Sequence, residues 1–274
     1  MLDSKIKIII ATHKKYRMPN DSMYIPVHVG AAGKKNNDGT ALELGYAKDD
    51  TGENISLKNP YYCELTGLYW AWKNLTADYI GLVHYRRHFK GKTKSKDPFE
   101  CVLTQKEAED LIKKYKVIVP KKRKYYIETL YSHYAHTHYA EQLDITRNII
   151  SEKYPEYLYA YDSVTKQTWG YMFNMMIMEK SYLNDYCTWL FTILEELENR
   201  IDMPELSAFQ LRFYGRVSEI IFNVWLKYQI ENGNLSQNNV KEVPCIHMEK
   251  INWFKKGTAF IKAKFVLRKY EGSF

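Results

Sequence analysis

The chain has 274 residues, of which 45% are apolar, so it can bury the core of one large α/β domain or two small ones. Its 40 lysines and arginines exceed its 32 acidic residues, which gives 40 − 32 = +8 and a pI near 9.0. This balance favours anionic partners such as phosphates, nucleic acid or an anionic membrane face, and the lack of a long apolar run excludes a membrane-spanning segment.

Cysteine usage and the first residues indicate a reducing compartment. No two cysteines form a CxxC pair, so we expect free thiols and no zinc ribbon. The four are Cys63, Cys101, Cys187 and Cys245. The first residues lead into an apolar strand and show no signal peptide, so we expect a cytoplasmic protein.

The first predicted element is a strand over residues 5–11, whose apolar run ends at Thr12 and His13. A strand at the start of a chain, followed by a polar turn, is typical of nucleotide-binding α/β domains. Residues 18–56 are rich in glycine, asparagine and aspartate. They predict a long irregular connection of the kind that often binds ligands.

The next part of the chain predicts two helices and the strand between them. Leucines and aromatic residues at helical spacing indicate a helix over residues 60–74. A short apolar run predicts a buried strand over residues 79–83. Thr104 followed by Glu107 has the spacing of a capping box, which places a helix over residues 104–115.

The second half predicts further strands and helices, with a basic and aromatic segment at residues 121–126. In chain order, the elements are a strand at 116–120, a helical stretch at 127–153, a strand at 171–178 and helices at 180–200 and 209–228. We find no internal repeat and no low-complexity linker, which favours one domain with a C-terminal extension.

The most informative segment follows the strand at 79–83, where the apolar run ends in His84, Arg86, Arg87 and His88. Ligands of open α/β sheets bind beyond the carboxyl ends of such strands. Guanidinium groups bind phosphate oxygens two at a time. The cluster therefore predicts a site for an anionic ligand. The alternative is a basic strand end on an ordinary surface.

Several segments together make a family recognisable, and the sequence His84-Tyr85-Arg86-Arg87 is the most distinctive of them. The segments are residues 11–14, 50–59, 62–74, 81–87 and 173–178. They resemble a bacterial family whose members are described as capsular polysaccharide synthesis proteins. These members look like glycosyltransferases, and some are associated with galactofuranose transfer. The resemblance runs from about residue 5 to about residue 228.

This resemblance implies a single GT-A-like, Rossmann-related α/β domain over residues 1–245, with a basic and aromatic extension over residues 246–274. It also implies a UDP-sugar donor, a saccharide acceptor and an inverting transfer in capsular or exopolysaccharide synthesis. Many such enzymes hold a divalent metal with Asp-x-Asp after an apolar strand, and this chain reads His84-Tyr85-Arg86 there. We therefore expect no cofactor, with Mn²⁺ or Mg²⁺ as the alternative.

Sugar transfer from a nucleoside diphosphate requires neutralisation of the leaving diphosphate and a base for the acceptor hydroxyl. We expect Arg86 and Arg87 to neutralise the diphosphate, with His84 as an additional donor. Successive strand residues point to opposite faces, so Arg86, which would share a face with His84, is favoured. The alternative is that one arginine pairs with a core carboxylate.

The other nucleotide-sugar contacts are expected from polar residues after the first strand and before the helix at 60–74. They are Thr12, His13, Asp50, Asn54, Ser56, Lys58 and Asn59. Lys58 offers a point charge for a phosphate. A strand-end turn is the alternative for Thr12 and His13, and helix capping for Asn59. Glu64 is expected to hydrogen-bond this loop.

The catalytic base is expected in the second half of the chain. The candidates are Asp162, Asp185, Asp202, Glu205 and Glu219. Glu219 is favoured, because an acid on an otherwise apolar helix requires an explanation. The alternative is an ion pair of Glu219 with Arg212 or Arg216.

His133, His136 and His138 are close in sequence but form no His-Glu-x-x-His pattern, so we expect no metal there. His133 and His138, together with Asn174, are expected on the acceptor side. An ordinary surface location is the alternative.

Residues 250–270 combine lysines and an arginine with aromatic and aliphatic side chains and contain no acidic residue. Such a segment lies on anionic lipid or packs as a final helix. The family resemblance implies an acceptor on a polyprenyl diphosphate carrier. We therefore expect a peripheral location on the inner face of the cell membrane.

Two other classes of function are alternatives. The net charge suits a nucleic-acid-binding protein, but no RRM, KH or helix-turn-helix signature is present, so we expect no nucleic-acid partner. The second alternative is a non-catalytic, membrane-associated assembly protein.

Overall fold

The computed structural model describes residues 5–201 and 206–249, which form two compact units. The first unit contains residues 5–121, 173–187 and 236–249, and the second contains residues 122–172, 188–201 and 206–235. Only four residues of the predicted extension at 246–274 lie within the described ranges. The predicted boundary at residue 245 therefore stays a prediction.

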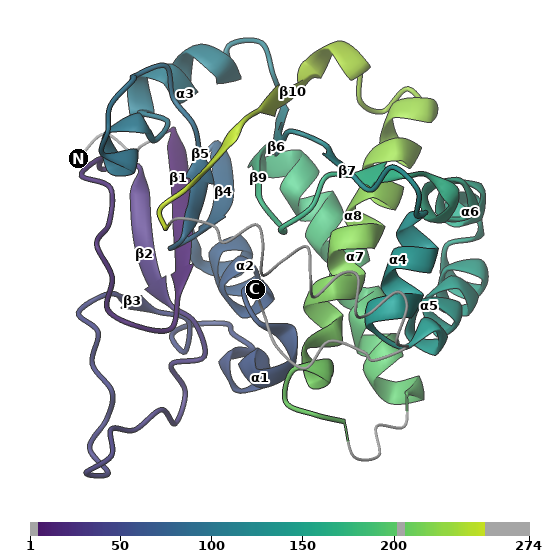
Figure 1. Ribbon diagram of the computed structural model, residues 1–274, viewed down its shortest axis with the longest axis horizontal. Helices are drawn as coiled ribbons and strands as arrows, with labels where there is room; N and C mark the ends of the chain where they lie inside the picture. Colours follow the sequence, from purple (N-terminus) through teal and green to yellow (C-terminus); the bar gives the residue numbers. More distant parts are fainter. Residues whose placement is uncertain (1–4, 202–205, 250–274) are drawn as a thin grey trace. The chain divides into compact units, whose positions relative to one another are not determined.

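The first unit is built on a mixed sheet with strand order β10-β6-β9-β4-β1-β2-β3, and β5 pairs with both β4 and β11 (Figure 1). The strands are β1 Ile6–Thr12, β2 Tyr24–His28, β3 Ala47–Lys48, β4 Tyr79–His84, β5 Arg87–Phe89, β6 Val117–Pro120, β9 Met176–Glu179, β10 Val240–Val243 and β11 Cys245–His247. β1 is parallel to β2 and β4, whereas β9 is antiparallel to β4 and β6. The predicted α/β class is confirmed, as are the strands expected at 5–11, 79–83 and 116–120.

The helices of the first unit begin where the sequence supplies a cap or a tight turn. They are α1 Asn59–Tyr62, α2 Leu65–Asn74 and α3 Gln105–Ile112, with 3₁₀ turns at Ser56–Lys58, Pro98–Cys101 and Gln237–Asn239. The predicted capping box is confirmed, because the Thr104 hydroxyl accepts from the Glu107 NH and the Glu107 carboxylate accepts from the Thr104 NH. Helix α7 Lys180–Arg200 has the predicted bounds, and its residues from 188 onward belong to the second unit.

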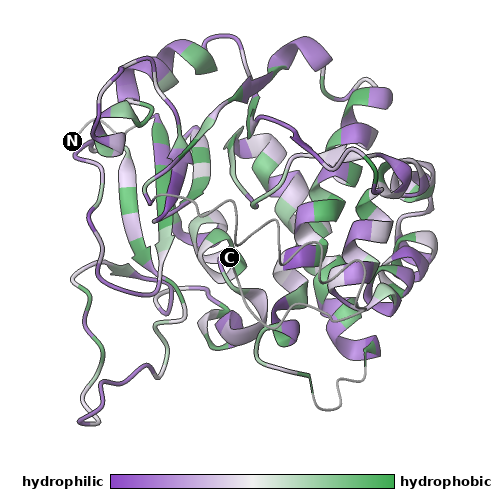
Figure 2. Cartoon of the chain, viewed as in Figure 1, coloured by the Kyte–Doolittle hydropathy of each residue, from purple (hydrophilic) through white to green (hydrophobic). Residues whose placement is uncertain are grey.

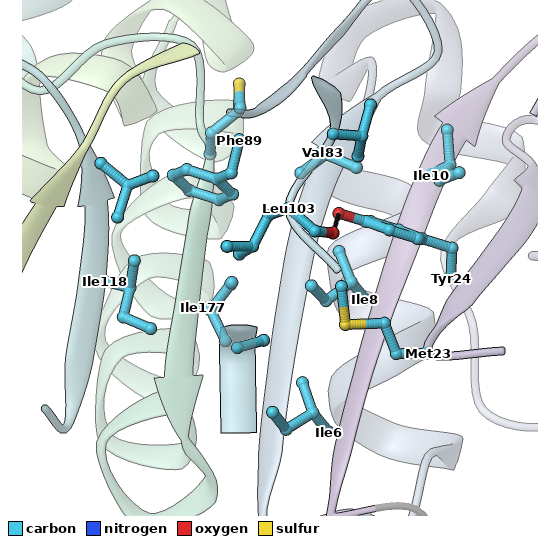
Figure 3. Packing of buried hydrophobic residues seen from close by; sticks show 14 of the residues in the cluster. Ile6, Ile8, Ile10, Met23, Tyr24, Val83, Phe89, Leu103, Ile118 and Ile177 are labelled. Carbon is cyan, nitrogen blue, oxygen red and sulfur yellow. Dashed lines mark hydrogen bonds between the residues drawn. The ribbon is translucent and has the colours of Figure 1, made fainter. Parts of the chain in front are cut away.

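One cluster of buried apolar side chains in the first unit lies on one face of the sheet (Figure 3). Ile6, Ile8 and Ile10 alternate along β1 and are almost fully buried, as β-branched residues on a pleated strand pack well. Tyr24 enters this core from β2, and its hydroxyl donates to the Leu103 carbonyl at 2.8 Å. The hydrogen bond lets a polar group lie inside an apolar core without an unsatisfied donor.

His88 on β5 is fully buried, and its ring meets the Tyr24 ring edge to face at 5.7 Å. Burial, together with the charge of His84, lowers the pKa of His88 to about 3. A histidine in an unfolded chain titrates near ~6.5. Between these two values the unfolded chain binds more protons, so the free energy of unfolding falls as the pH drops through this window.

We expect His88 to contribute about 2 kcal/mol to the loss of stability between pH 7.5 and pH 5. Urea unfolding at both pH values, on the wild type and on His88→Phe, measures this contribution. The variant should lose about 2 kcal/mol less than the wild type on acidification. Equal losses in the two proteins would contradict the assignment.

The connection at residues 18–56 is not wholly irregular, because it contains β2 and β3. The sequence Tyr-Ile-Pro-Val-His of β2 does not predict a strand, since proline lacks the NH that a strand interior uses. Within the described residues, β3 pairs only with Val27 and His28 of β2. Pro26 therefore has no β3 residue opposite it that would need a backbone NH as hydrogen-bond donor. The rest of the prediction holds, with turns and loops on both sides of β2.

The helix predicted at 60–74 is wrong as one element, because it divides into α1 and α2 at Cys63. Cys63 has φ of +54°, a conformation that ends a helix. The Asn59 side chain fixes this break by donating to the Cys63 carbonyl at 2.7 Å. Helical spacing of apolar residues continues across the break, which is why the sequence pattern does not reveal it.

The second unit is mainly helical. Its elements are β7 Arg123–Lys124, α4 Leu130–Thr137, α5 Ala140–Lys153, a 3₁₀ turn Pro155–Tyr157, α6 Leu158–Lys166, β8 Trp169–Gly170, a 3₁₀ turn Gln210–Arg212 and α8 Phe213–Glu231. Helices α5 and α6 carry both hydrophilic and hydrophobic stretches in Figure 2, as expected of helices with one buried face. Within the described ranges, no helix combines the length and apolar character needed to cross a bilayer.

Two further predictions need correction. The strand predicted at 171–178 begins only at Met176, because Phe173 and Asn174 form a turn with φ of +80° and +50°. The helical stretch at 127–153 is two helices, with His138 extended between them. All four cysteines are free thiols, as predicted.

Candidate functional site

The carboxyl ends of three parallel strands meet at one edge of the first unit's sheet. In the register, Thr12 on β1 pairs with His28 on β2, and Ala11 pairs with His84 on β4. The chain leaves β1 toward β2 on one side and later returns as β4 on the other, which makes this edge a topological switch point. Ligands of open α/β sheets bind at such points.

A hairpin at the end of β4 decides which arginine lies beside His84. The chain reverses through Tyr85 and Arg86, so His84 pairs directly with Arg87. Residues that oppose each other in an antiparallel pair project from the same face. The prediction that Arg86 shares a face with His84 is therefore wrong, because the strand does not continue past residue 84.

The turn at Phe173 and Asn174 lies against this hairpin. His84 Nε2 is 2.5 Å from the Phe173 carbonyl oxygen, and the Arg87 guanidinium lies 3.8 Å from the centre of the Phe173 ring. The buried Asn174 side chain donates to the Glu64 carboxylate at 2.7 Å. His84 on β4, Arg87 on β5, Glu64 at the N-cap of α2 and the two residues of this turn are thus brought together at the end of β4.

The backbone of this turn is strained. Phe173 and Asn174 are successive residues with positive φ, a conformation that costs a residue with a side chain about 1–3 kcal/mol. The contacts with His84, Arg87 and Glu64 hold the turn in place. Strain of this kind gathers at functional sites, where the surrounding structure keeps a group in a required position.

The contact with Phe173 fixes the tautomer of His84. Because a carbonyl oxygen only accepts, Nε2 carries the hydrogen and donates it. Burial lowers the pKa of His84; Arg87 and Arg86 lower it further, while Glu64 acts in the opposite direction. The ring is therefore neutral near pH 7, with Nδ1 as its acceptor nitrogen.

Two cationic groups and one imidazole surround the buried ring of Tyr85, one residue beyond His84. The His13 ring meets it edge on at 5.4 Å, Lys14 Nζ lies 5.3 Å from its centre, and the Arg86 guanidinium lies at 5.2 Å. All three side chains are exposed, and Arg86 also lies 3.5 Å from Glu249. This arrangement suits an anion such as a pyrophosphate.

Thr12 has the structural role given above as its alternative. Its buried hydroxyl donates to the Lys14 carbonyl at 2.7 Å and accepts from the Lys14 NH at 3.3 Å. These bonds turn the chain at the end of β1 and place His13 and Lys14 beyond the sheet edge. The sequence analysis did not single out Lys14, because a lysine in a surface turn carries no pattern of its own.

Asp49 organises the loops beside this edge, and the sequence analysis missed it. It is fully buried. Its carboxylate accepts four hydrogen bonds, from the NH groups of Gly30 (2.8 Å) and Ala31 (3.0 Å) and from the hydroxyls of Ser56 (2.5 Å) and Thr66 (2.6 Å). Nothing in the local sequence distinguishes the buried acid from its neighbour Asp50, which is half-buried.

The polar residues predicted to bind the nucleotide make hydrogen bonds within this loop region. Asn54 accepts from the Ser56 NH, and Asn59 donates to the Thr66 hydroxyl at 3.1 Å. Lys58 Nζ lies over the Tyr62 ring at 5.5 Å. A side chain on Gly30, whose φ is +68°, would meet Asn59, so the loop packs closely here. Contact of these residues with a nucleotide stays a prediction.

The second unit holds a separate group of ionisable side chains. The buried Glu128 carboxylate accepts from Nδ1 of His133 and Nδ1 of His136, each at 2.8 Å. Burial lowers the pKa of His133, while Glu128 opposes this shift. Burial acts to raise the pKa of Glu128, but the two imidazoles outweigh it and hold that pKa below its usual range.

The predicted base, Glu219, belongs to the same unit, on α8. Tyr125 lies 4.4 Å from the His133 ring. Burial raises the pKa of Tyr125 to about 12; Arg123 acts to lower it and the charge of Glu219 to raise it. Glu219 is half-buried on α8. His138, in contrast, is buried and bonds to Gln210 at 2.9 Å.

The other candidate bases have different environments. Asp162 binds Arg147 through both carboxylate oxygens at 2.7 and 2.8 Å, which is a structural ion pair. Asp185 is exposed on α7. Asp202 and Glu205 lie outside the described residues, as does the basic segment at 250–270.

The donor groups at the strand ends do not fit a divalent cation. Mg²⁺ and Mn²⁺ are bound by carboxylate and other oxygen ligands. At the place of the Asp-x-Asp pattern, His84 Nε2 is a donor and the Arg87 guanidinium is a cation. Within residues 5–201 and 206–249, no group of three or more His, Cys, Asp or Glu side chains is arranged to hold a metal ion.

A cavity of about 330 Å³ in the first unit lies elsewhere. It is lined by residues 17–21, Tyr24, Phe99, Glu100 and residues 102–104 and includes none of the predicted site residues. It borders the start of β2, whereas ligands of parallel strands bind at their carboxyl ends. We therefore place the candidate site at the strand ends.

Comparison with known proteins gives two matches. A family model described as a domain of unknown function, DUF4422, matches residues 7–231. The apo structure of WbbM, a bifunctional glycosyltransferase, superposes with a TM-score of 0.79 and 31% identity over 90% of this chain. The aligned region is 46% of the WbbM chain, so this chain spans about half of that protein. No curated protein matches.

Proposed function

The chain belongs to the DUF4422 domain family, and on this premise we propose that it is a glycosyltransferase that uses a UDP-sugar. The observation that carries the proposal is the likeness to WbbM, which extends over 90% of this chain at 31% identity. WbbM is a bifunctional glycosyltransferase. The strand-end site supports the proposal independently, because it combines cations with a switch point of the sheet.

On this proposal, Arg87 and the cations around Tyr85 bind the donor's pyrophosphate. The stacking of Arg87 on Phe173 at 3.8 Å holds the guanidinium before the ligand arrives. A charge that is already in position stabilises the leaving diphosphate without reorganisation during the reaction. Lys14 and Arg86 supply further positive charge from the loop beyond β1 and the hairpin beyond β4, and the His13 ring lies against the same tyrosine, Tyr85.

We propose that the leaving group is stabilised by these cations rather than by a metal. The chemistry of the donor groups supports this, since His84 donates a hydrogen bond and Arg87 is positively charged. His84 then holds the Phe173 carbonyl and so positions the strained turn. Asn174, which binds Glu64, belongs to the same turn and is proposed to contact substrate.

The acceptor is proposed to be a saccharide, carried on a polyprenyl diphosphate, and the sugar transferred is proposed to be galactofuranose. The resemblance of the His84-Tyr85-Arg86-Arg87 sequence to polysaccharide synthesis proteins supports both. Glu219 is proposed as the base of an inverting reaction, with His133 on the acceptor side. The contact of His133 with Tyr125, whose pKa the charge of Glu219 acts to raise, supports a joint role for the two.

A thermal-shift screen of nucleotides with and without EDTA tests the proposal. UDP and UDP-sugars are expected to raise the melting temperature, whereas ADP and GDP are not, because a ligand stabilises the state that binds it. The rise should persist in EDTA. A rise that requires manganese would overturn the metal-free proposal, and no response to any nucleotide would overturn the donor assignment.

A further inference from the structure

Two large apolar side chains of the second unit project into solvent between β7 and α4. Tyr126 is 80% exposed and Ile127 is 73% exposed. Scattered exposed apolar residues are common, but here two of them are adjacent in the chain. The segment at residues 121–126 is basic and aromatic, and the proposed transfer reaction makes no use of it.

A rare turn holds the two side chains outward. The Ile127 NH donates to the Tyr125 carbonyl at 2.7 Å, and Tyr126 between them has φ of +60°. An i to i+2 hydrogen bond around a residue of positive φ is a γ-turn of the strained kind. A tyrosine carries a steric cost in this conformation, so the flanking structure must maintain it.

The flanks of the turn are well anchored. On one side, the Tyr125 NH donates to the Thr168 carbonyl at 2.8 Å. On the other side, Glu128 is buried and accepts from His133 and His136. The exposed pair, which we call the tip (Tyr126 and Ile127), is therefore the projecting part of a fixed segment.

Three consecutive cations precede the tip. Lys122, Arg123 and Lys124 are exposed, and residues 122–127 contain no acidic residue. Lys122 Nζ lies 3.9 Å from the centre of the Trp169 ring, and the Arg123 guanidinium lies 5.0 Å from the centre of the Tyr125 ring. β7 is strongly hydrophilic in Figure 2. The segment thus joins a positive stretch to an apolar end.

We propose that the tip inserts into the surface of an anionic lipid bilayer, with Lys122, Arg123 and Lys124 against the headgroups. Tyrosine favours the membrane–water interface, and each cation near an anionic surface adds to the attraction. Two side chains are too small an area for a stable protein interface, which buries about 800 Å² per partner. They suffice for a peripheral membrane anchor that also uses charge.

The tip lies next in sequence to Glu128, which orients His133 and His136. A tip held in the bilayer keeps this ionisable group near the membrane surface, where a lipid-linked acceptor presents its saccharide. That consequence rests on the proposed function. The membrane contact itself does not, because it is measured without any nucleotide sugar.

Sedimentation with vesicles tests the proposal on the full chain. Vesicles of phosphatidylcholine alone and of phosphatidylcholine mixed with phosphatidylglycerol are compared for the wild type and for Tyr126→Ser/Ile127→Ser. We expect the wild type to sediment with the phosphatidylglycerol vesicles and less so at high salt. The double variant should bind about tenfold more weakly, because its tip has no apolar group to insert.

A matched control carries Leu57→Ser and Tyr159→Ser, whose wild-type residues are 77% and 76% exposed outside the tip. This control should sediment like the wild type, and Tyr126→Phe/Ile127→Leu should retain binding. Equal sedimentation of the wild type and the serine tip variant would overturn the proposal. The proposal would also be overturned if the wild type bound vesicles with and without phosphatidylglycerol equally. It would likewise be overturned if the wild type self-associated in solution and the serine tip variant did not.

Discussion

Replacing Arg87 by alanine is expected to lower the rate of sugar transfer by about 10²–10³, the range typical for loss of one preorganised electrostatic donor. The guanidinium is held over the Phe173 ring at 3.8 Å and faces the same side of the sheet as His84. On the proposed function, it meets charge that grows on the diphosphate as the bond to the sugar breaks. Steady-state kinetics with the UDP-sugar identified in the nucleotide screen measures the effect.

The size of the effect should differ between the two arginines. Arg86→Ala is expected to lower the rate of sugar transfer by about tenfold or less, because water screens the interaction of an exposed cation with the ligand. Its side chain is 51% exposed and already lies near Glu249. If Arg86→Ala costs more than Arg87→Ala, the side-chain assignment from the hairpin is wrong.

A third arginine provides the matched control. Arg17 also stacks on a phenylalanine, with its guanidinium 4.3 Å from the Phe99 ring, and it binds Asp97 at 2.6 Å. Arg17 and Phe99 both line the cavity at the start of β2. Arg17→Ala removes a similar stacking contact. If its rate of sugar transfer equals that of the wild type, the lower rate of Arg87→Ala comes from the loss of a group at the site and not from a general loss of folding.

Asp49→Asn is expected to lower the free energy of unfolding by about 3–5 kcal/mol. The carboxylate accepts four hydrogen bonds inside the protein, and an amide has only one acceptor oxygen. The new NH₂ group would face two donors. Urea denaturation of wild type and variant at one temperature measures the difference.

The neighbouring residue is the control for this change. Asp50→Asn removes the same charge from a half-buried position, and it should change stability by only about 0.5 kcal/mol. We also expect Asp49→Asn to weaken UDP binding, because the loops that Asp49 joins carry Ser56 and flank Lys58. A variant as stable as the wild type would show that the hydrogen bonds of Asp49 do not organise this region.

The local sequence was sufficient for much of the fold. The isoleucine run of β1, the apolar run of β4 and the capping box at Thr104 are each encoded by a few adjacent residues. The cations after β4 were likewise visible as a break in an apolar run. Features of this kind depend on short-range geometry, so their periodicity and spacing reveal them.

What the sequence by itself determined was therefore the α/β class, the bounds of α7 and the place of a basic strand end. Only the tertiary structure decided that Arg87 rather than Arg86 lies beside His84, that Asp49 is the buried acid and that residues 173–174 turn. The physical reason is that burial and side-chain direction depend on distant partners. His84 and the Phe173 carbonyl are 89 residues apart in the chain, and no local pattern records their contact.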